Sequence, residues 1–176
     1  GDTIKFQTFD SLNKTYFPNS VSINSSGKTS SGNISINSKA PLVLDNGTIS
    51  SDTFGSGKAG DIQITAPSIS LTNGAQLSAS THNTGKGGNI TLTATDRVEI
   101  SGETTKTPRG IFNDFSIIIG LPPGTYLGGY IPNGTTDQPP SGTLFPSGVF
   151  SQTTINSTGS AGDLRIETGK LIVENG

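Results

Sequence analysis

Apolar residues recur in short alternating groups along the chain, and turn-forming residues separate the groups. The stretch from Gly60 to Thr81 shows the pattern most clearly, with apolar positions at Ile62, Ile64, Ile69, Leu71 and Leu77. Alternation of apolar and polar residues over a few positions predicts a short strand with one buried face. Glycine, proline or asparagine lies between the groups, where these residues favour turns. The stretch therefore predicts three short strands joined by turns.

The same pattern returns at a fixed spacing. A motif of glycine, Asn or Asp, an apolar residue, any residue and a second apolar residue opens at Gly32-Asn33, Gly60-Asp61, Gly88-Asn89 and Gly162-Asp163. From residue 32 to 60 is 28 residues, and from 60 to 88 is again 28. From 88 to 162 is 74, which is 28 plus an insertion of 46. A fixed period indicates a repeat architecture. With a degenerate copy at residues 1–6, we expect about five coils, starting near residues 1, 32, 60, 88 and 162.

Two further strand positions recur within each copy. The second position reads Leu42–Leu44, Ile69–Leu71, Val98–Ile100 and Leu171–Val173. Asn-Gly pairs close three of these four segments, and both residues tolerate positive φ, which predicts a turn. The third position reads Thr48–Ser50 and Gln76–Ser78, and we expect residues 148–151 to fill it after the insertion.

Three short strands per repeat predict an all-β fold, a single-stranded parallel β-helix in which each repeat forms one coil. Neighbouring coils of such a stack are about 4.8 Å apart. One coil has too few apolar residues to fold alone, so stacking has to supply the core. The repeated Asn33, Asp61, Asn89 and Asp163 would then form one column, able to accept hydrogen bonds from turn backbone. An antiparallel β-sandwich is the alternative, and the identical motif every 28 residues favours the β-helix.

Residues 104–147 interrupt the third full coil with a proline- and aromatic-rich insertion. It holds seven of the ten prolines. One interpretation is a loop that folds back and covers the rod. The other is recognition, since insertions in repeat proteins map to loops on one side, often the binding side. In that case the candidate sugar-stacking residues are Phe112, Phe115, Tyr126 and Tyr130.

Composition excludes several functional classes. The hydrophobic fraction of 30% is low, but its periodic placement argues against disorder. Basic residues do not cluster and the net charge is -2, so we expect no nucleic-acid binding. No apolar run approaches the ~18 residues of a membrane span. The chain has no cysteine. Because it has neither a methionine nor a signal peptide, we expect it to be part of a longer protein.

The titratable residues suggest no catalytic centre. His82 is the single histidine and lies in a predicted turn, so we expect an exposed residue and no metal ligand. Glycoside hydrolysis needs two carboxyl groups within several ångströms. Asp61 and Asp163 share the predicted column, but another copy lies between them. We therefore predict that the chain is not an enzyme and that it has no catalytic residues, no metal site and no cofactor.

The stretch Gly60–Ser80 and the segment Pro146–Thr153 resemble the repeats of filamentous haemagglutinin-like exoproteins, especially the large cyanobacterial members. The resemblance is strongest over residues 32–96 and 146–176. It implies a right-handed parallel β-helix, two-partner secretion through an outer-membrane β-barrel transporter, and display at the cell surface. The secretion domain that this transporter recognises is not visible here. The family offers no catalytic residues to carry over.

Two functions follow as expectations. The first is a structural and adhesive module, part of the shaft of a larger secreted or cell-surface protein, with a host-cell or surface glycan as a possible partner. The alternative is a carbohydrate-binding or polysaccharide-degrading β-helix. An uncapped β-helix also presents open strand edges, so we expect some end-to-end self-association.

Overall fold

The structure is a computed structural model that describes residues 4–6, 8–10, 15–17, 20–104, 144–153 and 157–175. Its regular elements are β1 (Ile4–Phe6), β2 (Thr8–Asp10), β3 (Thr15–Phe17), β4 (Ser20–Ser22), β5 (Ile34–Asn37), β6 (Leu42–Asp45), β7 (Thr48–Ser50), β8 (Ile62–Thr72), β9 (Gln76–Ser78), β10 (Ile90–Ser101), β11 (Glu103–Thr104), β12 (Phe145–Pro146), β13 (Gly148–Phe150) and β14 (Leu164–Glu174). Throughout the described residues these elements are strands and none is a helix, so this part of the chain is all-β.

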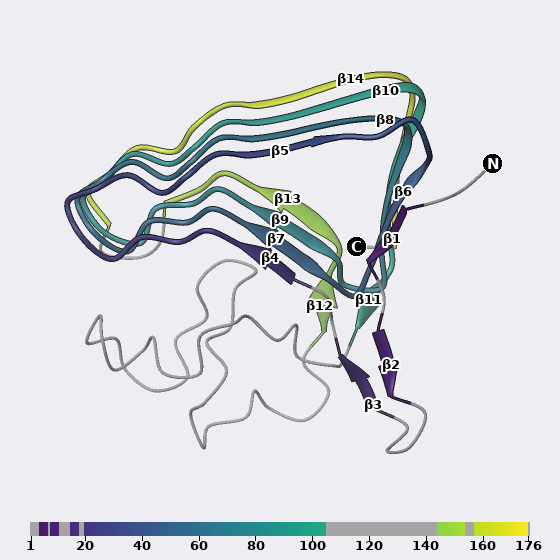
Figure 1. The fold of residues 1–176 in the computed structure, drawn as a ribbon, viewed down its shortest axis with the longest axis horizontal. Helices are drawn as coiled ribbons and strands as arrows, with labels where there is room; N and C mark the ends of the chain where they lie inside the picture. Colours follow the sequence, from purple (N-terminus) through teal and green to yellow (C-terminus); the bar gives the residue numbers. More distant parts are fainter. Residues whose placement is uncertain are drawn as a thin grey trace.

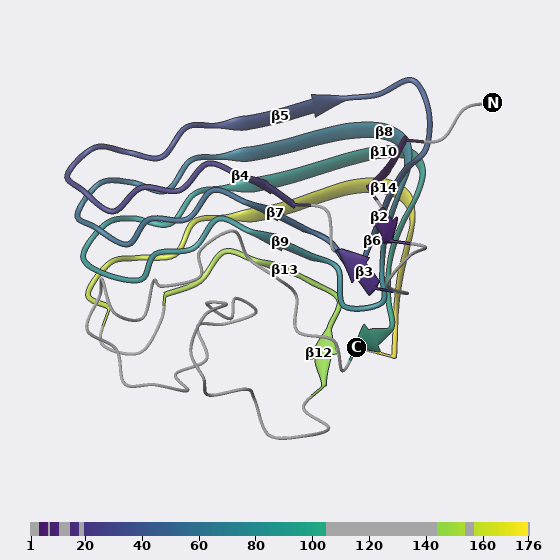
Figure 2. The same cartoon turned by 60° about the horizontal axis from the view of Figure 1, so that its bottom comes forward.

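Two parallel sheets contain most of the strands (Figure 1). The larger has the order β1-β6-β8-β10-β14, and β5 also pairs with β8. The smaller has the order β4-β7-β9-β13. The Gly32, Gly60 and Gly88 copies each contribute to both sheets, so segments far apart in sequence lie side by side. Figure 2 shows the strands of successive copies following one another in the same direction.

The register reproduces the repeat spacing. Ile62 pairs with Ile90 and Ile90 pairs with Leu164, so the first apolar residue of each motif lies beside its equivalent. In the smaller sheet Gln76 pairs with Thr48 on one side and with Gly148 on the other. The prediction that residues 148–151 resume the third strand position after the insertion is therefore confirmed for Gly148–Phe150.

The first and second strand positions merge in three of the repeats, as β8, β10 and β14. β8 runs without a break from Ile62 to Thr72, through Pro67. Proline has no N–H to donate to a sheet, which confines it to edges and bulges. The register with β10 shifts at this point, between Ala94 and Arg97, so β10 has one extra residue opposite the proline. This bulge lets the strand continue where the sequence predicts a turn.

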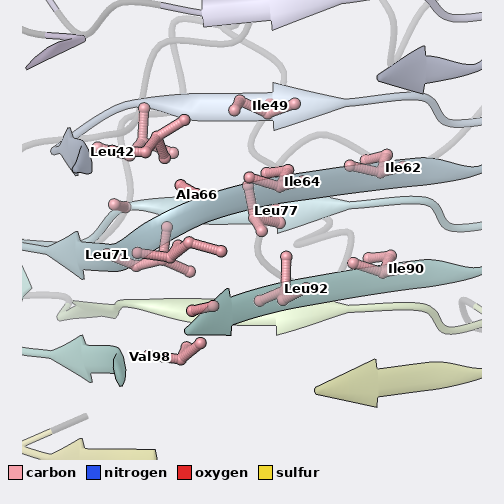
Figure 3. Packing of buried hydrophobic residues seen from close by; sticks show 14 of the residues in the cluster. Leu42, Ile49, Ile62, Ile64, Ala66, Leu71, Leu77, Ile90, Leu92 and Val98 are labelled. Atoms are coloured by element: carbon pink, nitrogen blue, oxygen red, sulfur yellow. The ribbon is translucent and has the colours of Figure 1, made fainter. Parts of the chain in front are cut away.

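Apolar side chains fill the space between the two sheets (Figure 3). Strands of the larger sheet supply Ile64 and Leu92, and the smaller sheet supplies Ile49 and Leu77, all 0% exposed. Full burial of one such side chain contributes about 1.5–3 kcal/mol. Because each repeat supplies only a few of these residues, the core depends on neighbouring repeats, as the sequence predicts.

The connection from the larger sheet to the smaller one passes through a single corner. In the Gly32 and Gly60 repeats it is a short turn, where Asn46 has φ 48° and Asn73 has φ 55°, confirming the predicted turns. Before the Gly32 repeat, the antiparallel pair β2–β3 leaves at this corner between β1 and β4. In the Gly88 repeat, the antiparallel pair β11–β12 leaves there between β10 and β13. Figure 1 shows both pairs extending from the same end of the sheets.

The first copy differs from its expected alignment. The sequence places Ile4 in the position of Ile34, at the first strand of a coil. In the structure β1 pairs with β6, with Ile4 beside Leu42. Residues 4–6 thus occupy the second strand position, because their short apolar pair fits either slot and the sheet register selects one.

Candidate functional site

The Asn and Asp residues that follow the repeat glycines form one hydrogen-bonded column, the exposed column: Asn33, Asp61, Asn89 and Asp163. Asn33 Oδ1 accepts a hydrogen bond from the Asp61 N–H at 2.9 Å. Asp61 Oδ1 accepts one from the Asn89 N–H at 2.8 Å. Asn89 Oδ1 accepts one from the Asp163 N–H at 2.9 Å. The side chains of Asn33, Asp61 and Asn89 thus each bind the backbone of the next repeat, which confirms the predicted role of this column.

The preceding glycines allow these backbones to approach each other. A Cβ atom built on Gly60 would overlap the carbonyl oxygen of Gly32, and one on Gly88 would overlap that of Gly60. The Ser51 hydroxyl bridges the backbones of Gly32 and Gly60. Its Oγ donates to the Gly32 oxygen at 2.7 Å and accepts from the Gly60 N–H at 3.1 Å. Gly60 and Gly88 are therefore required by close packing of main chain against main chain.

The carboxyl group of Asp61 carries a shifted pKa. Partial burial raises this pKa, but the hydrogen bond from the Asn89 N–H and the nearby Lys58 and Lys86 ammonium groups outweigh burial and lower it. Lys58 Nζ lies 2.9 Å from Asp61 Oδ1, and each of these two side chains is 40% exposed. Because the pair is open to water, it fixes the local geometry more than it stabilises the fold.

A second polar column lies inside the molecule. This buried column consists of Asn24, Asp52 and Ser80. Asn24 Oδ1 accepts from the Asp52 N–H at 2.8 Å, and Asp52 Oδ1 accepts from the Ser80 N–H at 2.7 Å. The Ser78 hydroxyl also donates to Asp52 Oδ1 at 2.7 Å. The Asp52 side chain is 0% exposed, so its carboxylate depends on these donors in place of water.

His82 lies against this buried column. Its Nε2 is 3.7 Å from Asp52 Oδ2, and its side chain is 1% exposed. Its ring stacks on Phe54, with centroids 4.3 Å apart and planes 14° apart. The prediction of an exposed turn residue is therefore wrong. The parallel bridge between Thr53 and Thr81 continues the stacking through this turn and brings the imidazole over the preceding repeat.

The repeat spacing contains a signal for the buried positions of Asp52 and His82. Moving 28 residues from Asp52 gives Ser80, and moving 28 from Phe54 gives His82. Aligning all positions of two copies, and not only the strand motif, would have placed the imidazole on the phenyl ring.

The buried group contains the residue types of a hydrolytic triad, but its surroundings do not suit catalysis. Ser78, Ser80 and Asp52 are 4%, 0% and 0% exposed, respectively. A nucleophilic serine has to reach a substrate carbonyl, with an imidazole as its base. The Ser78 hydroxyl instead donates to the carboxylate of Asp52. The arrangement is suited to holding neighbouring repeats together.

The other predicted site residues are placed as follows. Phe112, Phe115, Tyr126 and Tyr130 lie outside the described residues, so their proposed sugar contacts stay a prediction. Asp61 and Asp163 belong to one column with Asn89 between them. Among the described residues, no three His, Cys, Asp or Glu side chains form a group that could hold a metal ion. That part of the chain also has no helix long and apolar enough to cross a membrane.

Comparison with known proteins gives no relative, since no family model, no curated protein and no solved structure matches the chain.

Proposed function

We propose that the chain forms a right-handed, single-stranded parallel β-helix. The observation that carries this proposal is the register, in which equivalent residues of successive repeats pair in parallel in both sheets. A chain that returns to the same sheet once per repeat has to wind around a common axis. Parallel crossover connections are right-handed in about 98% of cases, which supports the choice of hand.

The proposed role is structural and adhesive, in the shaft of a larger secreted or cell-surface protein. The resemblance to filamentous haemagglutinin-like repeats supports this role, together with export of that larger protein by a partner transporter in the outer membrane. The columns support it physically, because the repeated glycines let neighbouring backbones approach closely and side-chain oxygens of both columns accept hydrogen bonds from the backbone of the next repeat. A rod of this kind holds the segments that leave the corner between the two sheets away from the cell. There they meet a host cell or a surface glycan.

The winding is tested by electron paramagnetic resonance with pairs of spin labels. The chain lacks cysteine, so labelled cysteines are easily introduced at outward positions. Ser35, Gln63, Thr91 and Arg165 occupy one register position in successive strands. The label separations from Ser35 should rise by about 4.8 Å per strand. Separations that fail to rise in this order would overturn the β-helix.

The surface role is tested on intact cells of the producing organism. Antibodies against the purified chain should label them without permeabilisation, and beads coated with the chain should adhere to a target cell or glycan. Labelling seen only after permeabilisation would refute the surface assignment. Adhesion unchanged by Tyr126→Ala and Tyr130→Ala would remove these tyrosines as the contact. Cleavage of a polysaccharide by the purified chain would favour the enzymatic alternative.

A further inference from the structure

Two of the corner turns place an asparagine directly before a glycine. Asn46 precedes Gly47 between β6 and β7, and Asn73 precedes Gly74 between β8 and β9. Both asparagines have positive φ, a conformation that this residue type tolerates in turns. The turn thus brings in a dipeptide whose backbone nitrogen can attack the preceding side chain. Glycine makes the attack easier, because it has no side chain beside that nitrogen.

The reaction is deamidation through a cyclic imide. The glycine backbone nitrogen attacks the side-chain carbonyl carbon of the asparagine. The proton of that nitrogen passes to the side-chain amide nitrogen, which leaves as ammonia, and a succinimide ring remains. Water then adds to one of the two ring carbonyls and opens the ring. The product is aspartate, or isoaspartate in which the main chain runs through the former side chain. Water is the only reactant, and nothing is oxidised or reduced.

In the Asn73 turn, hydrogen bonds hold both reacting groups. Asn73 Nδ2 donates to Asp45 Oδ1 at 2.6 Å. The Gly74 N–H donates to Ser147 Oγ at 2.9 Å, and this contact is buried. Both bonds have to break before the Gly74 nitrogen can turn toward the Asn73 side chain. The Asn73 N–H also donates to the Ser101 carbonyl at 3.2 Å, which ties the turn to the next repeat.

The Asn46 turn is held less firmly. Asn46 Oδ1 is buried and has no hydrogen-bond partner among the described residues, and the Gly47 N–H donates to none of them either. Two backbone hydrogen bonds hold this turn: the Asn46 N–H donates to the Thr72 carbonyl, and the Gln76 N–H donates to the Gly47 carbonyl, both at 2.9 Å. A buried acceptor without a donor is destabilising, and opening the turn exposes it to water. The Asn46 turn should therefore open at lower cost than the Asn73 turn.

We propose that Asn46-Gly47 is a site of spontaneous deamidation in the folded protein, and that Asp45 and Ser147 protect Asn73-Gly74 from the same reaction. The modification gives the corner between β6 and β7 a second carboxylate next to Asp45, and isoaspartate also lengthens its main chain. The inference goes beyond the proposed surface role and does not depend on it.

The test incubates the folded chain in mildly alkaline buffer and follows both asparagines by peptide mapping with mass spectrometry. Asn46 should convert about tenfold or more faster than Asn73, because the bond to the charged acceptor alone slows the attack by about this factor. In urea, where the chain is unfolded, the two asparagines should convert at similar rates.

Two variants test the protection of Asn73. Ser147→Ala removes the acceptor of the Gly74 N–H and should raise Asn73 conversion several-fold while leaving Asn46 conversion unchanged. Asp45→Asn keeps an oxygen for Asn73 Nδ2, removes the charge, and should raise Asn73 conversion as well. Circular dichroism checks that both variants are folded.

Equal conversion of the two asparagines in the folded chain, or faster conversion of Asn73, would overturn the proposal. So would a preference for Asn46 that persists in urea, because the local sequence would then set the rate. If neither folded variant raises Asn73 conversion, Asp45 and Ser147 do not protect it. The measurement follows only residues of this chain, so its failure is separate from failure of the surface role.

Discussion

Asp61 and Asp52 accept the same kind of hydrogen bond in two columns of one molecule, but their surroundings differ. The Asp61 side chain is 40% exposed and has Lys58 beside it. The Asp52 side chain is 0% exposed and lies beside His82 and two serines. Water can replace a lost partner in the exposed column and cannot do so in the buried one. The cost of a substitution should therefore follow burial, since the hydrogen bonds themselves are alike.

The largest effect is expected for Asp52→Ala. It removes the acceptor of the Ser80 N–H and the Ser78 hydroxyl and leaves buried polar groups behind. A buried donor left without an acceptor costs about 1–3 kcal/mol, and this variant leaves two such donors. Urea unfolding should show this loss in the free energy of unfolding, whereas Asp61→Ala in the exposed column should lose much less. Equal losses for the two variants would contradict the contrast between the columns.

A substitution in the glycine column should have an intermediate effect. Gly88→Ala places a methyl group against the Gly60 carbonyl, so the two repeats have to move apart. Overpacking of this kind costs about 1–3 kcal/mol. The matched variant is Gly27→Ala, whose added Cβ would meet nothing within 4 Å. Thermal unfolding of the two should differ by several degrees, and equal midpoints would show that the repeats are not held this closely.

The smallest effect is expected for Asp61→Asn, and it depends on pH. The folded-state pKa of Asp61 is lowered, so its charge contributes stability above the unfolded value of 3.8 and loses that contribution as pH falls through the folded value. Asparagine keeps the oxygen for the Asn89 N–H and removes the charge. At neutral pH the variant should be less stable by under about 1 kcal/mol.

The difference between wild type and Asp61→Asn should begin to shrink below about pH 4, disappear once the pH is below the lowered folded pKa, and also shrink in high salt. Urea unfolding at several pH values measures it. A difference that stays constant down to pH 2 would show that the carboxylate acts through something other than its charge.

Local sequence patterns predicted the features that repeat and missed those that depend on position in the stack. The motif at Gly60-Asp61 predicted the column and its hydrogen bonds, because a regular spacing places equivalent atoms beside each other. His82 was misjudged since a turn in isolation is exposed, and only stacking on Phe54 buries it. Pro67 was expected to end a strand, and a bulge in β10 accommodates it.

The corner that carries β2–β3 and β11–β12 has an evolutionary consequence. Gly148 pairs with Gln76 in the same register as Gln76 with Thr48, although the chain before Gly148 includes an added segment and the chain before Gln76 does not. The number of residues in the connection at this corner can therefore change without changing how the strands pair. New sequence can enter one repeat by a single genetic event without altering its neighbours. The turns at Asn46 and Asn73 are accordingly the places where a foreign loop or epitope tag should be tolerated best.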